Sequence, residues 1–172
     1  MAIFAITAIA VAFIACVVAI AACDLSNFTI PNSIAVALIF LFLASIPFAR
    51  GDLSLLSHLY SFLIVLGIGL IAFRFGMFGG GDIKSWAAIA VWYDLQALPV
   101  QVIYVALIGG GIGIALLGIR YLVARPIVHV HLEYRRVPRL LRLGEPVPYG
   151  LAIAAGTLMS ANKIDLFRWL PT

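Results

Sequence analysis

The sequence predicts an all-α protein that crosses a membrane about six times. Hydrophobic residues make up 65% of the 172 positions and charged residues only 10%, and the mean hydropathy is +1.17. A soluble domain is typically about 45–50% apolar, so this composition indicates a chain built for lipid. The first apolar run, residues 2–22, has no charged side chain. At about 1.5 Å per helical residue it is long enough to cross a hydrocarbon core of about 30 Å.

Six hydrophobic segments follow one another along the chain. They are residues 2–22, 31–48, 59–75, 83–93, 100–123 and 149–160. The fourth and sixth are shorter than the roughly 20 residues that a spanning helix needs, so we expect them to extend at their ends or to be re-entrant. The only sizeable polar stretch is a basic loop at about 125–148. We therefore interpret residues 1–172 as a single integral-membrane domain.

The start of the chain argues against a cleaved or lipidated first segment. A secretory signal normally carries a basic region before its apolar run, and here no Lys or Arg precedes the run. The same absence argues against Cys23 as a lipid-anchored terminus. The two cysteines, Cys16 and Cys23, offer neither a disulfide framework nor a CxxC pair.

Basic residues predict the orientation, because cytoplasmic loops collect Lys and Arg. We place residues 23–30 on the cytoplasmic side. That side then holds eight basic residues, namely Arg74, Lys84, Arg120, Arg125, Arg135, Arg136, Arg139 and Arg142, and the outer side holds three, namely Arg50, Lys163 and Arg168. The net charge of +4 therefore indicates topology and attraction to anionic membrane lipids, with no nucleic-acid partner.

Asp82 stands out in the stretch MFGGGDIKSW, residues 77–86. A carboxylate beside the hydrocarbon region costs several kcal/mol unless it faces water or a partner, so it is a candidate for function. Three glycines precede it, and the absence of side chains there lets another backbone come close, such as that of an extended peptide. Asp82 also suits a capping role at a helix beginning at Ile83, and the two roles are compatible.

A second aspartate, Asp24, ends the first span in the stretch CDLSNFTIPN, residues 23–32. In that stretch Pro31 suits the start of the second helix and Asn32 suits capping of nearby amides. Alone, Asp24 would be an ordinary interfacial charge, but the topology puts it at the same face as Asp82. Two carboxylates within a few ångströms do not easily both ionise, so such a pair can act as acid and base on one water molecule.

Together these residues resemble the bacterial type IV prepilin peptidases, membrane aspartic proteases of the GxGD type. The resemblance is strongest to the short forms of tight-adherence (Flp-type) pilus systems. It rests on Asp24 with Ile-Pro-Asn at 30–32, on Gly-Gly-Gly-Asp at 79–82 with Lys84, and on Pro-Tyr-Gly at 148–150. The order of these motifs and the six-segment layout cover nearly the whole chain.

The resemblance implies that the chain cuts a short basic leader from prepilins at the cytoplasmic face of the bacterial inner membrane. It implies no cofactor and no metal, a prepilin as substrate, membrane lipids around the chain, and contact with the pilus assembly machinery. Asp24 and Asp82 would be catalytic. The residues expected to bind substrate or shape the site are Gly79, Gly80, Gly81, Lys84, Pro148, Tyr149 and Gly150, with Pro31 and Asn32 as structural neighbours.

Two departures from the family pattern bear on activity. Larger members carry an extra cytoplasmic domain with cysteine pairs, associated with N-methylation, and this chain has no room for it, so we expect a protease without methyltransferase activity. Many relatives also carry basic residues before the Ile-Pro-Asn motif, where this chain has Ser-Asn-Phe-Thr at 26–29. That difference bears on which substrates the chain would prefer and does not affect the pair of aspartates.

Other functions and roles stay open at this stage. A small proton- or cation-coupled transporter could use the same aspartates, although we find no internal repeat of the kind transporters carry. Lys84 either lowers the pKa of a carboxylate or binds a substrate carbonyl, or it extends to the lipid headgroups. His129 and His131, with Glu133, either face solvent or bind a metal. His58 is expected to be an interfacial residue on the outer side.

Overall fold

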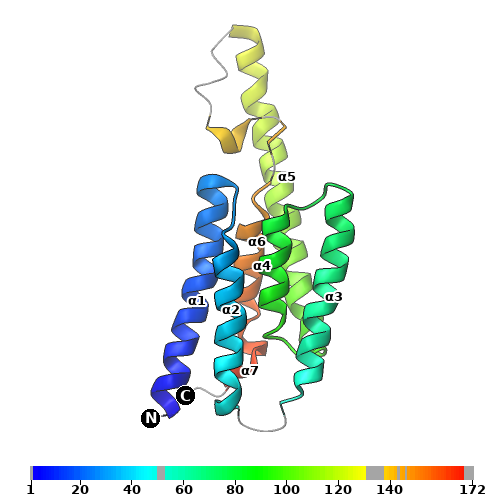
Figure 1. The fold of residues 1–172 in the computed structure, drawn as a ribbon. Coiled ribbons are helices and arrows are strands. Elements are labelled where there is room, and N and C mark those ends of the chain that lie inside the picture. The colour runs from blue at the N-terminus through cyan, green and yellow to red at the C-terminus, as the bar shows by residue number, and fades with distance from the viewer. Residues whose placement is uncertain (1, 50–52, 131–137, 143, 146, 169–172) are drawn as a thin grey trace.

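The computed structural model describes residues 2–49, 53–130, 138–142, 144–145 and 147–168, and within them it contains helices and no strand. The α-helices are α1 (Ala2–Asn27), α2 (Asn32–Ser45), α3 (Leu55–Arg74), α4 (Gly80–Ala90), α5 (Leu98–Val130), α6 (Tyr149–Met159) and α7 (Asp165–Arg168). They pack side by side in one bundle (Figure 1). The predicted all-α class is confirmed.

Among the residues that the structure describes, three helices are long and apolar enough to cross a membrane, namely Ala2–Asn27, Leu55–Arg74 and Leu98–Leu122. Their outward faces carry bare apolar side chains, such as Phe4 at 82% and Ile114 at 75% exposed, which suit contact with lipid. The fourth and sixth helices are short, as predicted, with 11 residues each. The chain is therefore an all-α membrane protein.

The two short helices lie inside the bundle. α4 packs against α2 and α3, and α6 packs against α1 and α5 (Figure 1). Small residues allow this burial: a Cβ atom at Gly156 of α6 would lie 2.7 Å from the backbone nitrogen of Val105 in α5. The C-terminal ends of α1 and α3 and the N-terminal ends of α2, α4 and α6 meet at one end of the bundle (Figure 1).

Two predicted segment ends were wrong by about five residues or more. α1 continues beyond residue 22 to Asn27, because the polar residues there still make helical hydrogen bonds, and it stops where Phe28 adopts a positive φ of 53°. α5 continues through Pro126 to Val130, so the basic loop does not begin at residue 125. Proline removes one helical hydrogen bond, and a helix already this long tolerates that loss.

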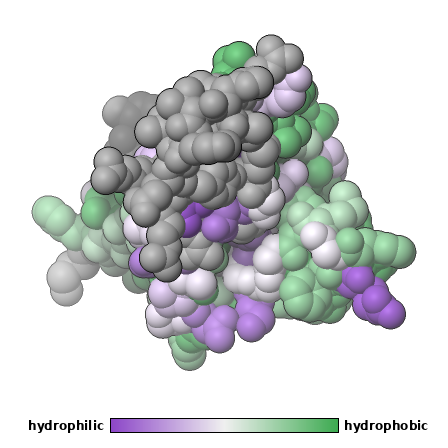
Figure 2. All heavy atoms as spheres, turned by 90° about the horizontal axis from the view of Figure 1, so that it is seen from above, coloured by the Kyte–Doolittle hydropathy of each residue, from purple (hydrophilic) through white to green (hydrophobic). Residues whose placement is uncertain are grey.

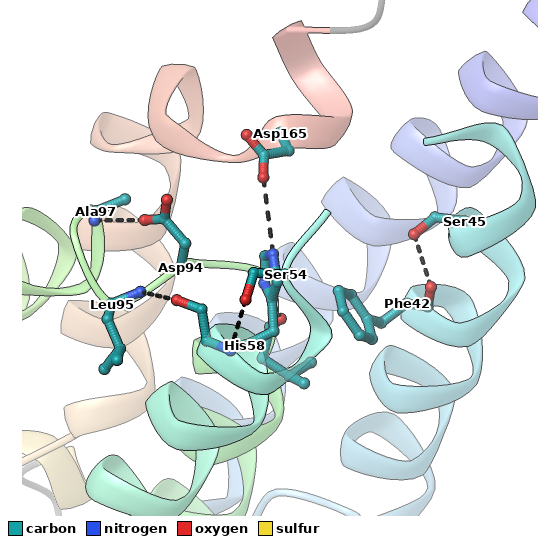
Figure 3. A network of polar contacts seen from close by, with 10 residues as sticks. Phe42, Ser45, Ser54, His58, Asp94, Leu95, Ala97 and Asp165 are labelled. Atoms are coloured by element: carbon teal, nitrogen blue, oxygen red, sulfur yellow. Dashed lines mark hydrogen bonds and ion pairs between the residues drawn. The ribbon is translucent and has the colours of Figure 1, made fainter. Parts of the chain in front are cut away.

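The opposite end of the bundle contains a polar network around His58 (Figure 3). The side chain of His58 is only 2% exposed, and its Nδ1 donates a hydrogen bond of 2.9 Å to the carbonyl of Val91. Its Nε2 lies 3.7 Å from Oδ2 of Asp165 in α7. The expected interfacial position was therefore wrong: His58 is a buried link between α3, the end of α4 and α7, because a buried imidazole needs partners on both ring nitrogens.

Candidate active site

Asp82 lies in the first turn of α4, where its Oδ2 accepts a hydrogen bond of 3.2 Å from the backbone N–H of Gly79. The helix begins at Gly80 rather than at Ile83, so Asp82 is its third residue and binds back to the residue before the helix. This bond satisfies one of the amides that every helix start leaves without a partner. The carboxylate is thus held in place at the start of its own helix. Asp82 does cap this helix, from the third position rather than from the residue before it.

The glycines before Asp82 allow close packing of α4. A Cβ atom at Gly81 would lie 3.4 Å from both the backbone nitrogen and the backbone oxygen of Ile30, and one at Gly79 would lie 3.0 Å from Oδ2 of Asp82. The backbone that approaches Gly81 is therefore the chain's own, in the loop that leads into α2. Side chains at these positions would press on the loop and on the carboxylate.

Asp24 lies in the last turn of α1 and is 4% exposed. Its Oδ2 accepts a hydrogen bond of 2.6 Å from the backbone N–H of Gly150, and the N–H of Leu151 also binds this carboxylate. These amides begin α6, whose N-cap residue Pro148 supplies no side-chain cap. Asp24 therefore caps a helix from a different part of the chain, at the positive end of its dipole, which stabilises a negative charge.

The Pro-Tyr-Gly segment at 148–150 lies directly against Asp24. A Cβ atom at Gly150 would be 2.8 Å from the Cβ of Asp24 and 2.9 Å from its Oδ2, so only glycine fits there without a shift. Tyr149 packs its ring 4.4 Å from that of Phe78, and Pro148 is buried at the N-cap of α6.

Both aspartates line the same two cavities. One cavity measures about 280 Å³ and the other about 530 Å³. The smaller is lined by Asp24, Phe28, Thr29, Ile30, Asn32, Gly79, Gly80, Gly81 and Asp82. The larger shares Asp24, Phe28, Gly79 and Asp82 with it and is otherwise lined by Gly76, Met77, Phe78, Val147 and Tyr149. Figure 2 looks onto this end of the bundle, where hydrophilic residues gather near the middle of the face beside a hydrophobic flank. The structure thus brings together two carboxylates that are far apart in sequence.

The pKa of Asp82, which lies outside the three long apolar spans, is shifted. Burial is the main cause and the negative charge of Asp24 is the second, and together they raise the pKa of Asp82 to about 6 from its usual 3.8. The hydrogen bond from Gly79 N–H opposes this shift. Two carboxylates that influence each other in this way can hold one proton between them, which suits joint acid and base work.

Lys84 and Asn32 bind each other beside this site. Nζ of Lys84, an exposed residue of α4, donates a hydrogen bond of 3.2 Å to Oδ1 of Asn32 at the start of α2. The carboxamide oxygen expected to cap backbone amides is thus engaged by a side chain. Pro31 is the N-cap residue of α2, with φ −62° and ψ 137°, as expected for a proline at a helix start.

Some residues at this end were not predicted. Phe28 lines both cavities and Val147 lines the larger one. Phe28 also adopts a positive φ of 53°, which no sequence motif indicated. Arg120 of α5 is 3% exposed and donates to the carbonyls of Leu140 (3.0 Å) and Glu145 (2.7 Å). It ties the segment before Pro148 to α5. An arginine within an apolar helix is unusual, and this was the feature of the sequence that could have indicated Arg120.

The histidines considered as metal ligands, His129 and His131, are not tested by the structure. His131 and Glu133 lie outside the described residues, and the side chain of His129 is likewise not described. Among the residues that the structure does describe, no group of three or more His, Cys, Asp or Glu side chains is placed to hold a metal ion. Cys16 and Cys23 are both free thiols in α1.

The sequence model of the type IV leader peptidase family matches residues 11–114 of this chain. The match spans more than half of the chain and includes Asp24, Asp82 and the three glycines, whereas α6 with residues 148–150 lies beyond it. The chain therefore belongs to the type IV leader peptidase family and is a membrane peptidase. No curated protein and no solved structure is significantly similar to it.

Proposed function

We propose that this protein is an aspartic endopeptidase that removes the leader from Flp-type prepilins, with Asp24 and Asp82 as its catalytic pair. The observation that carries the proposal is the shared lining of two cavities by these aspartates, with the charge of one raising the pKa of the other. Family membership supports the reaction type, since leader peptidases hydrolyse a peptide bond.

In the proposed mechanism, one carboxyl of the pair keeps its proton and the other is ionised. The ionised carboxylate takes a proton from a water molecule, whose oxygen attacks the carbonyl carbon of the scissile bond, while the protonated carboxyl donates its proton to the carbonyl oxygen. The tetrahedral intermediate then collapses, the C–N bond breaks, and the leaving nitrogen takes a proton from the pair. The two apparent pKa values belong to the pair as a whole.

The charge distribution supports cleavage at the cytoplasmic face of the inner membrane. The end of the bundle that carries the aspartates is the end to which the sequence assigns eight of eleven basic residues. A leader rich in Lys or Arg would stay on that side for the same reason. We limit the proposal to hydrolysis, without N-methylation of the new terminus.

The proposal is tested by co-expressing this protein with a Flp-type prepilin in cells that have no other leader peptidase, and measuring the prepilin mass. We expect the mass to fall by that of the leader, with a new N-terminus that carries no methyl group. A prepilin that stays full length, beside a chain shown to be folded and membrane-inserted, would overturn the proposal. A proton-flux assay on the same protein in vesicles would then test the transporter alternative.

A further inference from the structure

Gln101 of α5 is a fully buried amide whose two ends bond to two different helices. It is 0% exposed. Its Oε1 accepts a hydrogen bond of 3.0 Å from Nε1 of Trp86 in α4, and its Nε2 donates one of 3.4 Å to Oγ1 of Thr157 in α6. The indole N–H only donates, so the carboxamide oxygen has to face Trp86. One side chain of α5 therefore joins α4 to α6, which also lie against each other (Figure 1).

Each of the two joined helices positions one of the aspartates. Trp86 follows Asp82 by four residues, which is about 6 Å along α4 at about 1.5 Å per residue. Thr157 follows Gly150 by seven residues, about 10 Å along α6, and the N–H of Gly150 binds Asp24. The bridge thus lies one to two helical turns from both carboxylates, and their spacing depends on how α4 is placed against α6.

The ring of Trp86 also supports the wall of the larger cavity. Its centroid lies 6.1 Å from that of Phe78, and the ring of Phe78 lies 4.4 Å from that of Tyr149. Phe78 and Tyr149 both line the cavity that holds the aspartates. The indole cannot turn without leaving the buried oxygen of Gln101 unsatisfied, which is costly. The same bond therefore fixes the indole on which this aromatic wall rests.

We propose that the bond between Gln101 and Trp86 sets the spacing of the two carboxylates, with Trp86 as the positioning residue. The inference rests on the proposed function. Plain cohesion of the bundle is the competing explanation, but apolar side chains would hold these helices together without burying an amide, which costs free energy that its bonds largely offset. A hydrogen-bonded link instead selects one arrangement of the helices. Such precision matters for chemistry, because a misplacement of about 1 Å can cost about a hundredfold in rate.

Two variants break this bond in different ways. Gln101→Met keeps the length of the side chain and Trp86→Phe keeps an aromatic ring, and each removes the hydrogen bond. We expect each to lower kcat for a Flp-type prepilin about tenfold or more with little change in KM, because the substrate still binds while the carboxylates are misplaced. The double variant should be no slower than the slower single variant, since both changes remove the same bond.

The matched control is Tyr93→Phe. The hydroxyl of Tyr93 forms a hydrogen bond of 2.8 Å with Oγ of Ser160, so it also ties the chain after α4 to the end of α6, but 11 residues beyond Asp82. Its loss should lower the melting temperature about as much as the loss of the Gln101 bond and leave kcat close to that of the wild type. Equal losses of kcat in Tyr93→Phe and Trp86→Phe would show general cohesion and overturn the inference.

The pKa of Asp82 gives a readout that does not depend on the substrate. The charge of Asp24 contributes to raising that pKa to about 6. Without the bridge the two like charges are free to move apart, so carbon-13 NMR of the labelled carboxyl should show a lower pKa in Gln101→Met and an unchanged one in Tyr93→Phe. An unchanged pKa in both variants would overturn the inference. If the pKa shifts as expected but the wild type leaves the prepilin intact, the proposed function is what fails.

Discussion

Oδ2 of Asp24 accepts a hydrogen bond of 2.6 Å from the backbone N–H of Gly150, which lies 126 residues further along the chain. This contact joins the last turn of α1 to the first turn of α6, and it places one carboxylate of the site by means of a helix outside the matched family region. It makes Asp24 both a cap for α6 and a lining residue of the cavities. A substitution at Asp24 therefore affects a helix cap as well as the candidate catalytic pair.

Gly150→Ala should damage the site although alanine favours helices. The added Cβ would lie 2.8–3.0 Å from three atoms of Asp24, so the carboxylate must move. We expect a loss of about 1–3 kcal/mol in stability and at least a tenfold loss of cleavage. Thermal melting in detergent and prepilin cleavage measure the two effects.

The matched control for that change is Gly110→Ala. No atom lies within 4 Å of a Cβ placed at Gly110 in α5, so alanine there should be neutral or stabilise by up to about 1 kcal/mol. If Gly150→Ala behaves like this control, the close contact with Asp24 does not matter for activity.

Cleavage should depend on pH through Asp82. Because its pKa is raised to about 6, the pair keeps its shared proton below that pH and loses it above, so kcat/KM should fall as the pH rises through about 6. In Asp24→Asn the neighbouring charge is gone, so the pKa of Asp82 should drop, yet stay above 3.8 because burial remains the larger cause. Carbon-13 NMR of the labelled carboxyl measures that pKa. A flat rate profile between about pH 5 and 8 would contradict the shared proton.

The bond between Lys84 and Asn32 should appear as an energetic coupling. Lys84→Met and Asn32→Ala each remove the same 3.2 Å contact between α4 and α2. In a double-mutant cycle on stability we expect a coupling of about 0.5–1.5 kcal/mol, typical of one hydrogen bond. Strictly additive effects would show that the two side chains act independently.

His58 should matter for stability and not for chemistry. His58→Ala removes a buried ring and leaves the carbonyl of Val91 without its donor, so we expect a loss of about 2–4 kcal/mol. Cleavage per folded molecule should be unchanged, because His58 lies at the end of the bundle opposite the aspartates (Figures 1 and 3). Tyr60→Ala, on the exposed side of the same helix, serves as the control and should have little effect on melting. A changed pH profile in His58→Ala would contradict this division.

Hydrophobic runs were enough to predict the helical segments, because a chain in lipid has to satisfy its backbone within helices. The ends were less predictable, since polar residues such as Asp24 continue α1 and Pro126 fails to stop α5. Both aspartates of the candidate site could be identified because a carboxylate is costly beside hydrocarbon.

What sequence could not supply is the partner of each polar group. That Asp24 caps α6, that Arg120 holds the carbonyl of Glu145, and that His58 is buried all depend on which helix ends meet. These pairings join residues far apart in the chain, so no local pattern encodes them.

The most direct test of the catalytic pair compares three aspartates of similar local chemistry. Asp24, Asp82 and Asp94 each accept a hydrogen bond from a backbone N–H, but Asp94 does so with Ala97 at the far end of the bundle. The measurement is the mass of a Flp-type prepilin incubated with each Asp→Asn variant, all shown to be folded. We predict that Asp24→Asn and Asp82→Asn leave the prepilin full length while Asp94→Asn releases the leader at the wild-type rate. Release of the leader by either of the first two variants would contradict the proposed pair.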